Sequence, residues 1–133
     1  MLTPNLPEAE ILCGARIGDL KAMREAARAL LDLGCRAVLL KGGHLPGDTV
    51  YDVLATRSGL KEWTSPRIAT RYTHGTGCTL ASAIAAGLAQ GMAVEAAVER
   101  ARDYVQRAIA GAPGFGRGHG PLDHAYPLSA RSR

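Results

Sequence analysis

A helical stretch that leads directly into a strand apolar on both faces is the feature that most constrains the fold of this chain. The predicted helix covers residues 20–33, with Asp19 as its N-cap and Gly34 after its last turn. Its apolar residues fall on one face: Leu20, Met23, Ala27, Leu30 and Leu31. Residues 37–40 follow as a strand without a polar side, which indicates burial on both faces. This order is typical of an α/β fold with a parallel sheet.

The rest of the chain adds short strands and two further helices. Residues 50–55 and 60–64 are predicted strands joined by a turn at Ser58-Gly59, and residues 67–72 are a third strand candidate. The stretch 78–90 is rich in Ala, Leu and Ile and almost uncharged, so we expect a helix buried nearly all round.

An amphipathic helix is predicted over residues 94–109, and the glycine-rich stretch 111–120 is predicted to be a loop. We see no repeat and no low-complexity linker. The expected organisation is therefore one domain over residues 1–124, followed by a flexible basic tail at 125–133.

Composition narrows the class of protein. The chain has 133 residues, 47% hydrophobic and 21% charged, which is typical of one globular domain. No apolar run reaches the ~18 residues of a membrane span, and residues 1–10 lack the pattern of a signal peptide. The cysteines, Cys13, Cys35 and Cys78, are scattered and odd in number, so we expect no disulfide framework, no zinc site and a cytoplasmic location.

The positive charge is unevenly placed. Residues 1–66 hold eight basic and eight acidic residues, whereas residues 67–133 hold eight basic and four acidic. This bias suits an anionic ligand such as a nucleotide phosphate, although a solvated basic surface explains most of the arginines equally well. Nucleic-acid binding is not expected, because the basic residues are not interleaved with stacking aromatic residues.

The sequence Gly75-Thr76-Gly77-Cys78 marks a candidate anion site. A turn that passes directly into a helix presents free backbone N–H groups at the positive end of the helix dipole. Glycine permits close approach of a phosphate and a backbone with positive φ. On this short motif alone, a structural turn with Cys78 as a small core residue is the favoured interpretation.

Two familiar phosphate motifs are excluded at this turn. A Walker loop requires a lysine, and none follows Gly77. The dinucleotide fingerprint requires a third Gly or Ala where Leu80 stands.

The wider segment 73–85, Thr-His-Gly-Thr-Gly-Cys-Thr-Leu-Ala-Ser-Ala-Ile-Ala, resembles the anion-hole segment of the ribokinase-like superfamily. It is most similar to the hydroxymethylpyrimidine/phosphomethylpyrimidine kinases of thiamine biosynthesis. In sugar-kinase relatives an aspartate stands where Cys78 does, and the pyrimidine kinases carry the cysteine.

Three further segments resemble the same family in the same order. Residues 3–10 contain its Asn-x-x-Glu motif as Asn5 and Glu8, Lys41-Gly42-Gly43 follows the strand 37–40, and residues 118–122 resemble its closing motif. The resemblance spans residues 3 to about 124. It implies an α/β fold, the C-terminal half of a ribokinase-like three-layer α/β/α sandwich.

The resemblance also implies a reaction and roles. The reaction is transfer of the ATP γ-phosphoryl group to hydroxymethylpyrimidine and then to its monophosphate. Backbone N–H groups of Gly75, Thr76, Gly77 and Cys78 would hold the phosphoryl oxygens, and Cys78 would act as base or polariser at the acceptor oxygen. ATP would contact Lys41, Gly42, Gly43 and Asn5, and Glu8 would orient Mg²⁺.

Simpler interpretations stay open for two of these motifs. Asn5 and Glu8 have the spacing of a helix capping box, which needs no metal. Lys41 is also compatible with an ordinary solvated strand end, although the two glycines after it favour a phosphate role.

Family members have a preceding half that supplies several core strands and most of the pyrimidine pocket. Residues 1–2 are expected to be too short for the strand that leads into Thr3. We therefore expect a homo-oligomer or association with a separate N-terminal half. A non-catalytic phosphate-binding remnant and a kinase of pyridoxal-type vitamins are the alternative functions.

Overall fold

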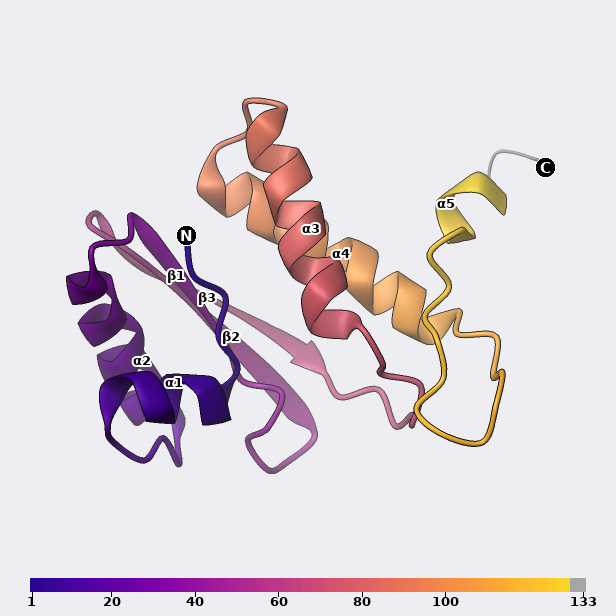
Figure 1. Ribbon diagram of the computed structural model, residues 1–133, viewed down its shortest axis with the longest axis horizontal. Helices are drawn as coiled ribbons and strands as arrows, with labels where there is room; N and C mark the ends of the chain where they lie inside the picture. Colours follow the sequence, from indigo (N-terminus) through magenta and orange to yellow (C-terminus); the bar gives the residue numbers. More distant parts are fainter. Residues whose placement is uncertain (130–133) are drawn as a thin grey trace. The chain divides into compact units, whose positions relative to one another are not determined.

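The computed structural model describes residues 1–129, and by internal contacts the chain divides into two units, one ending at Arg67 and one beginning at Ile68 (Figure 1). The prediction of one domain over residues 1–124 is not tested by this division. Residues 126–129 of the predicted tail form a short helix, α5 (Tyr126–Ser129), and residues 130–133 lie outside the described residues.

The first unit contains one three-stranded sheet in the order β1-β2-β3. Its strands are β1 (Ala37–Lys41), β2 (Thr49–Thr56) and β3 (Gly59–Pro66), so the predicted strands at 37–40, 50–55 and 60–64 are confirmed. Both pairings are antiparallel. The expectation of a parallel sheet is wrong for these strands, because the connections 42–48 and 57–58 are too short for a parallel crossover.

Parallel pairing occurs, among the described residues, at the N-terminal segment. Leu2 and Asn5 form isolated parallel bridges with Val38 and Lys41. The N–H of Leu39 donates to the carbonyl of Leu2 (2.8 Å), and the N–H of Lys41 donates to the carbonyl of Pro4 (3.0 Å). Leu2 therefore pairs with the sheet through an isolated bridge, and residues 1–2 form no strand of their own, as expected.

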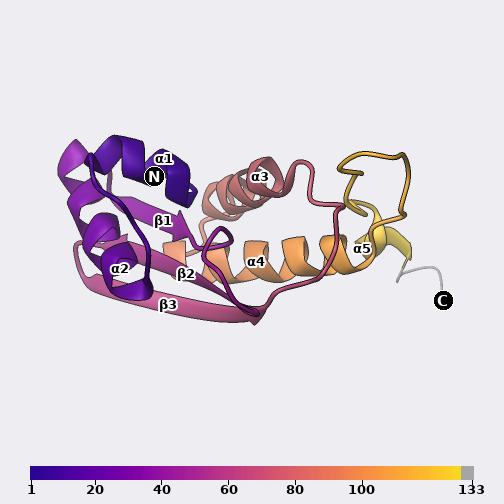
Figure 2. The ribbon, with the colours of Figure 1, turned by 90° about the horizontal axis from the view of Figure 1, so that it is seen from below.

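Two helices cover one face of this sheet (Figure 2). They are α1 (Leu6–Cys13) and α2 (Leu20–Ala29), and α2 continues into a 3₁₀ turn, η1 (Leu30–Leu33). The helix predicted over 20–33 is thus confirmed, with its last turn tightened and ended by Gly34 at φ 92°. The core between helices and sheet contains Met23, Ala26, Ala27, Leu30, Val38, Leu40, Val53 and Ala55.

The second unit is built on a pair of adjacent helices, α3 (Thr76–Ala89) and α4 (Val94–Ala110). Gly87 allows their close approach, since a Cβ there would lie 2.9 Å from the Cβ of Ala97. The predicted all-round burial of the stretch 78–90 is wrong: Leu80, Ile84 and Gly87 are buried, whereas Ala85 and Ala86 are exposed. The helix predicted over 94–109 and the loop over 111–120 are confirmed.

The segment before α3 is not the strand predicted over residues 67–72. Two of its N–H groups are used in local turns: Thr70 donates to the carbonyl of Ile68 (2.9 Å), and Tyr72 donates to Oγ1 of Thr70 (3.1 Å). A strand ladder would require those donors to face a neighbouring strand. No helix among the described residues is long and apolar enough to cross a membrane.

A two-point ion pair joins α2 to β3. Nε and Nη2 of Arg24 donate to the two carboxylate oxygens of Glu62 at 2.6 and 2.9 Å. These hydrogen bonds, more than the attraction of the charges, lower the pKa of Glu62 below its ordinary value. Both side chains are partly exposed, at 41% and 30%, so solvent weakens the pair.

We expect Arg24→Met to lower the melting temperature by a few degrees at pH 7. A carboxyl whose pKa is lowered by folding stabilises the native state above its unfolded pKa, about 4.3 for Glu, and loses this contribution as pH falls through its folded value. The difference between wild type and Arg24→Met should therefore shrink as the pH falls below about 4.3, and should be smaller at pH 3 than at pH 7. Thermal melts at both pH values check this, and an undiminished difference at pH 3 would contradict it.

Candidate active site

The glycine turn of the second unit is a helix start without a side-chain cap. Gly75 is the N-cap residue of α3 at φ 83° and ψ 2°, a conformation that side chains rarely adopt. By contrast, Asn5 caps α1 and Asp19 caps α2 through their side-chain oxygens. The first turn of α3 also contains no acidic residue. Its backbone donors are therefore left for another acceptor.

Thr79 holds this turn in place. Its N–H and its hydroxyl both donate to the carbonyl of Gly75, at 2.9 and 2.8 Å. The N–H of Thr76 points back to the carbonyl of Thr73 (3.3 Å). Gly77 and Cys78 follow in the first turn, where N–H groups have no acceptor within the helix. The predicted residues 75–78 thus lie together at one positive helix end, suited to an anion.

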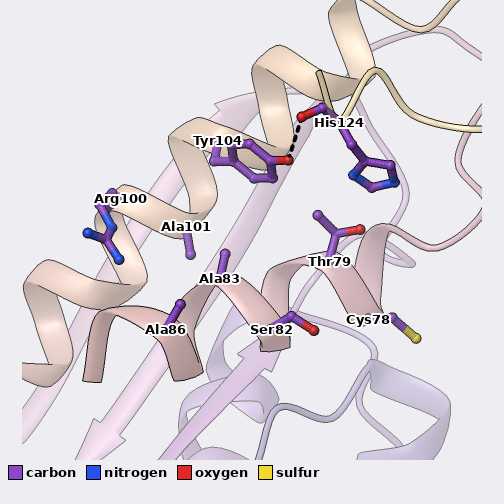
Figure 3. Close-up of a pocket in the computed structure, with 9 residues that line it drawn as sticks. All are labelled: Cys78, Thr79, Ser82, Ala83, Ala86, Arg100, Ala101, Tyr104 and His124. Carbon is purple, nitrogen blue, oxygen red and sulfur yellow. Dashed lines mark hydrogen bonds between the residues drawn. The ribbon is translucent and has the colours of Figure 1, made fainter. Parts of the chain in front are cut away.

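Cys78 is exposed at the end of an open groove of about 590 Å³ between α3 and α4 (Figure 3). In Figure 3 the side chain of Thr79 is directed towards α4, whereas the sulfur of Cys78 points away from it. The hydroxyl of Tyr104 donates to the carbonyl of His124 (3.0 Å) across the other side of the groove. The sulfur is therefore accessible to a ligand bound at the helix start.

The glycine-rich closing motif packs on the residues just before the turn. Nδ1 of His119 lies 3.1 Å from the carbonyl oxygen of Arg71. A Cβ on Gly120 would lie 2.4 Å from Cδ1 of Tyr72, so glycine is required there by the close approach of the ring. The guanidinium of Arg71 also lies over the Tyr72 ring, 5.2 Å from its centre. The packing of Tyr72 against Gly120 was not predicted, because nothing in the sequence distinguishes Tyr72 from the other aromatic residues.

In the first unit, Asn5 and Glu8 form a capping box. The N–H of Glu8 donates to Oδ1 of Asn5 (2.9 Å), and the N–H of Asn5 donates to Oε2 of Glu8 (2.8 Å). The simpler of the two interpretations offered by the sequence therefore describes the geometry. It does not test a metal role, which would use the remaining carboxylate oxygen.

Lys41, Gly42 and Gly43 lie at the end of β1, beside Asn5. A Cβ on Gly42 would lie 2.0 Å from the carbonyl oxygen of Tyr51, so this glycine is required by packing against β2. Its N–H donates to Oδ1 of Asp52 (3.2 Å), an aspartate only 8% exposed. By contrast, nothing lies within 4 Å of a Cβ on Gly43.

Arg67 closes the loop that follows these glycines. Its guanidinium donates to the carbonyls of Gly43 (2.7 Å), Gly47 (2.7 Å) and Leu45 (2.5 Å). The sequence indicated only a basic residue of unspecified role. The predicted site residues thus form two groups, each within its own unit. The group of the second unit is Gly75 to Cys78, and the group of the first unit is Asn5, Glu8 and Lys41 to Gly43.

The residues that could bind Mg²⁺ are few. Among residues 1–129, no three His, Cys, Asp or Glu side chains cluster as a metal site. Glu8 is exposed, and the capping box engages its Oε2. Mg²⁺ bound to nucleotide phosphates keeps several waters and needs only one or two carboxylates, so Glu8 fits a supporting role and not a complete metal site.

Known proteins similar to this chain are kinases. Residues 1–123 match the family model described as phosphomethylpyrimidine kinase. The chain is 55% identical over 124 residues to the thiamine biosynthesis bifunctional protein ThiED of Geobacter sulfurreducens. The aligned region is 93% of this chain and 25% of that protein. It is 49% identical over 126 residues to the hydroxymethylpyrimidine/phosphomethylpyrimidine kinase of Streptomyces coelicolor. The aligned region is 95% of this chain and 46% of that protein.

The fold matches solved kinases as well. A pyridoxal kinase from Bacillus subtilis, solved as an ADP complex, superimposes with a TM-score of 0.89 at 34% identity, over 96% of this chain and 51% of that one. The predicted α/β, ribokinase-like fold is confirmed. The chain spans about half, or less, of the length of these proteins, and it corresponds to their C-terminal part.

Proposed function

Since the chain belongs to the phosphomethylpyrimidine kinase family, we propose that it carries the phosphoryl-transfer half of an ATP-dependent kinase acting on hydroxymethylpyrimidine and its monophosphate. The observation that carries this proposal is the uncapped start of α3, where Gly75 adopts φ 83° and Cys78 is exposed beside the free donors of the first turn. We place the activity in the cytoplasm, consistent with three free cysteines.

The turn would act by positioning and by neutralising charge, which phosphoryl transfer mainly requires. The N–H groups of Gly77 and Cys78 would bind oxygens of the transferred phosphoryl group. Their direction is fixed beforehand, because Thr79 ties the turn to the carbonyl of Gly75. The thiol of Cys78 would sit at the acceptor oxygen and receive or polarise its proton.

The first unit would supply the second set of contacts. Lys41, at the end of β1, would neutralise nucleotide phosphate charge. Glu8, held by Asn5, would support Mg²⁺ through water, and the ion would neutralise charge on the β- and γ-phosphates.

Two variants of one helix test the proposal. In Gly75→Ala a Cβ is forced into a left-handed conformation, which costs about 1–2 kcal/mol or distorts the turn. We expect turnover of ATP with hydroxymethylpyrimidine phosphate to fall about tenfold or more. Gly91→Ala introduces the same strain at the other end of α3, at φ 81° and with nothing within 4 Å of its Cβ, and should leave turnover unchanged. Equal losses in both variants would contradict the role of the turn.

Two other functions are separated by the same assay. The pyridoxal kinase likeness makes a pyridoxal-type substrate the second candidate, so pyridoxal and hydroxymethylpyrimidine are compared as acceptors. A chain that binds ATP and Mg²⁺, measured by calorimetry, but turns over neither acceptor would be a phosphate-binding protein that works through assembly. Association with a second copy or with a separate N-terminal half is then measured by light scattering.

A further inference from the structure

We propose that Arg67 is a positioning residue for nucleotide phosphates, which folds the loop after Lys41 around its guanidinium so that backbone N–H groups face outward. This inference rests on the proposed function of Lys41, which would neutralise nucleotide phosphate charge. It assigns to Arg67 a role distinct from direct phosphate binding.

The contacts show an arginine committed to its own loop. Nε donates to the carbonyl of Gly47 at 2.7 Å, Nη1 to that of Gly43 at 2.7 Å and Nη2 to that of Leu45 at 2.5 Å. The backbone N–H of Arg67 also donates to the carbonyl of Asp48 at 2.7 Å. Four bonds therefore join one residue after β3 to the connection between β1 and β2. Charge-assisted bonds of this kind are short and directional, which lets a single arginine set the path of a loop.

The direction of the carbonyls fixes the direction of the amides. In a trans peptide the N–H points opposite to the carbonyl of the preceding residue, and no peptide bond of the described residues is cis. Because the carbonyls of Gly43 and Gly47 point at the guanidinium, the N–H groups of His44 and Asp48 point away from it. The carbonyl of Leu45 precedes Pro46, which has no N–H. The loop thus has an inner surface of acceptors and an outer surface that includes donors.

The charge has the sign that an anion needs. Arg67 is itself exposed and places a positive guanidinium on the carbonyl side of the loop, and Gly43 and His44 are exposed on the loop next to Lys41. Backbone N–H groups gathered at a concave turn are a general means of binding phosphate, and a neighbouring cation adds favourable potential. Removal of the guanidinium would leave three carbonyls without their shared donor, and these peptides would be free to rotate.

The experiment compares two arginines of the same unit. Arg67→Met removes the loop contacts, and Arg24→Met removes a two-bond arginine contact to Glu62 on β3 that does not involve the loop. Affinity for ATP with Mg²⁺ is measured by calorimetry and stability by thermal melting. Loop order is measured in ¹⁵N-labelled chain by proton exchange of the Leu45 amide, whose N–H donates to the carbonyl of Gly42 (3.0 Å). Arg67→Lys tests whether a cation without the planar fork suffices.

We expect Arg67→Met to bind ATP about tenfold more weakly and to exchange the Leu45 amide faster, with Arg67→Lys intermediate and Arg24→Met unchanged in both. Equal affinity in wild type and Arg67→Met would overturn the positioning role while leaving the proposed function intact. A matching loss of affinity in Arg24→Met would also overturn it, because general destabilisation would then explain the loss. Absence of ATP binding by the wild-type chain would overturn the proposed function, and the role of Arg67 with it.

Discussion

Replacing Cys78 with alanine is expected to lower turnover of ATP with hydroxymethylpyrimidine phosphate by about 100-fold or more, with little change in affinity for ATP. The sulfur is exposed at the start of α3 and is not needed for packing, so the variant should fold normally. Removal of a group that handles the acceptor proton typically costs ~10²- to 10⁴-fold in rate. Steady-state kinetics together with calorimetric ATP binding measure the two effects separately.

The other cysteines supply the control. Cys35 is half-buried, packs against the core and has its Sγ 3.5 Å from the carbonyl of Leu30. Cys35→Ala should lower stability slightly and leave the rate unchanged. Cys78→Asp places a carboxylate at the same position, as in sugar-kinase relatives, and should retain more of the rate than alanine if the residue acts as a base. Full activity of Cys78→Ala would refute a catalytic role for the thiol.

Replacing Gly42 with alanine is expected to have the largest effect on folding. The new Cβ would lie 2.0 Å from the carbonyl oxygen of Tyr51 and 3.0 Å from Cε of Met23. The first of these neighbours is backbone, so β1 and β2 would have to separate. This movement would also weaken the bond from the Gly42 N–H to the buried Asp52.

Overpacking of this kind costs about 3 kcal/mol or more, which corresponds to a fall of ~12 °C or more in the melting temperature of a small unit. Circular dichroism melts measure the change. Gly43→Ala is the matched control, because its Cβ meets nothing within 4 Å and its φ is not positive, and it should melt within about 2 °C of wild type. Equal melting of the two variants would show that the strands at Gly42 are less tightly paired than described.

Features set by local pattern could be predicted from the sequence. The strand at 37–40 and the helices at 20–33 and 94–109 form where their apolar periods place them. The turn at 75–78 was also located correctly, because glycine, positive φ and a helix start are linked through the backbone itself. The family followed from four motifs in order, and its model matches residues 1–123.

Features set by contacts between residues distant in the sequence could not be predicted from the sequence. Arg67 reads as a surface cation until the loop 43–47 folds over it. Gly42 resembles a phosphate-binding glycine, yet its backbone neighbour Tyr51 accounts for it. Asn5 and Glu8 satisfied two patterns at once, and only coordinates show the capping box. The direction of β2 relative to β1 was wrong, because helix-then-strand order does not report the length of the connection that follows the strand.

The two parallel bridges of the N-terminal segment bear on the order of folding. Leu2 pairs with Val38 and Asn5 with Lys41, residues 36 positions apart in each case, whereas the hairpin of β2 and β3 closes over two residues. Closing a longer loop loses more chain entropy, so local hairpins form sooner than distant pairings. We infer that the hairpin forms early and that the segment carrying Asn5 and Glu8 joins β1 late. The capping box of Asn5 and Glu8 is local to α1, but the position of this motif beside Lys41 would then be set by one of the last steps of folding.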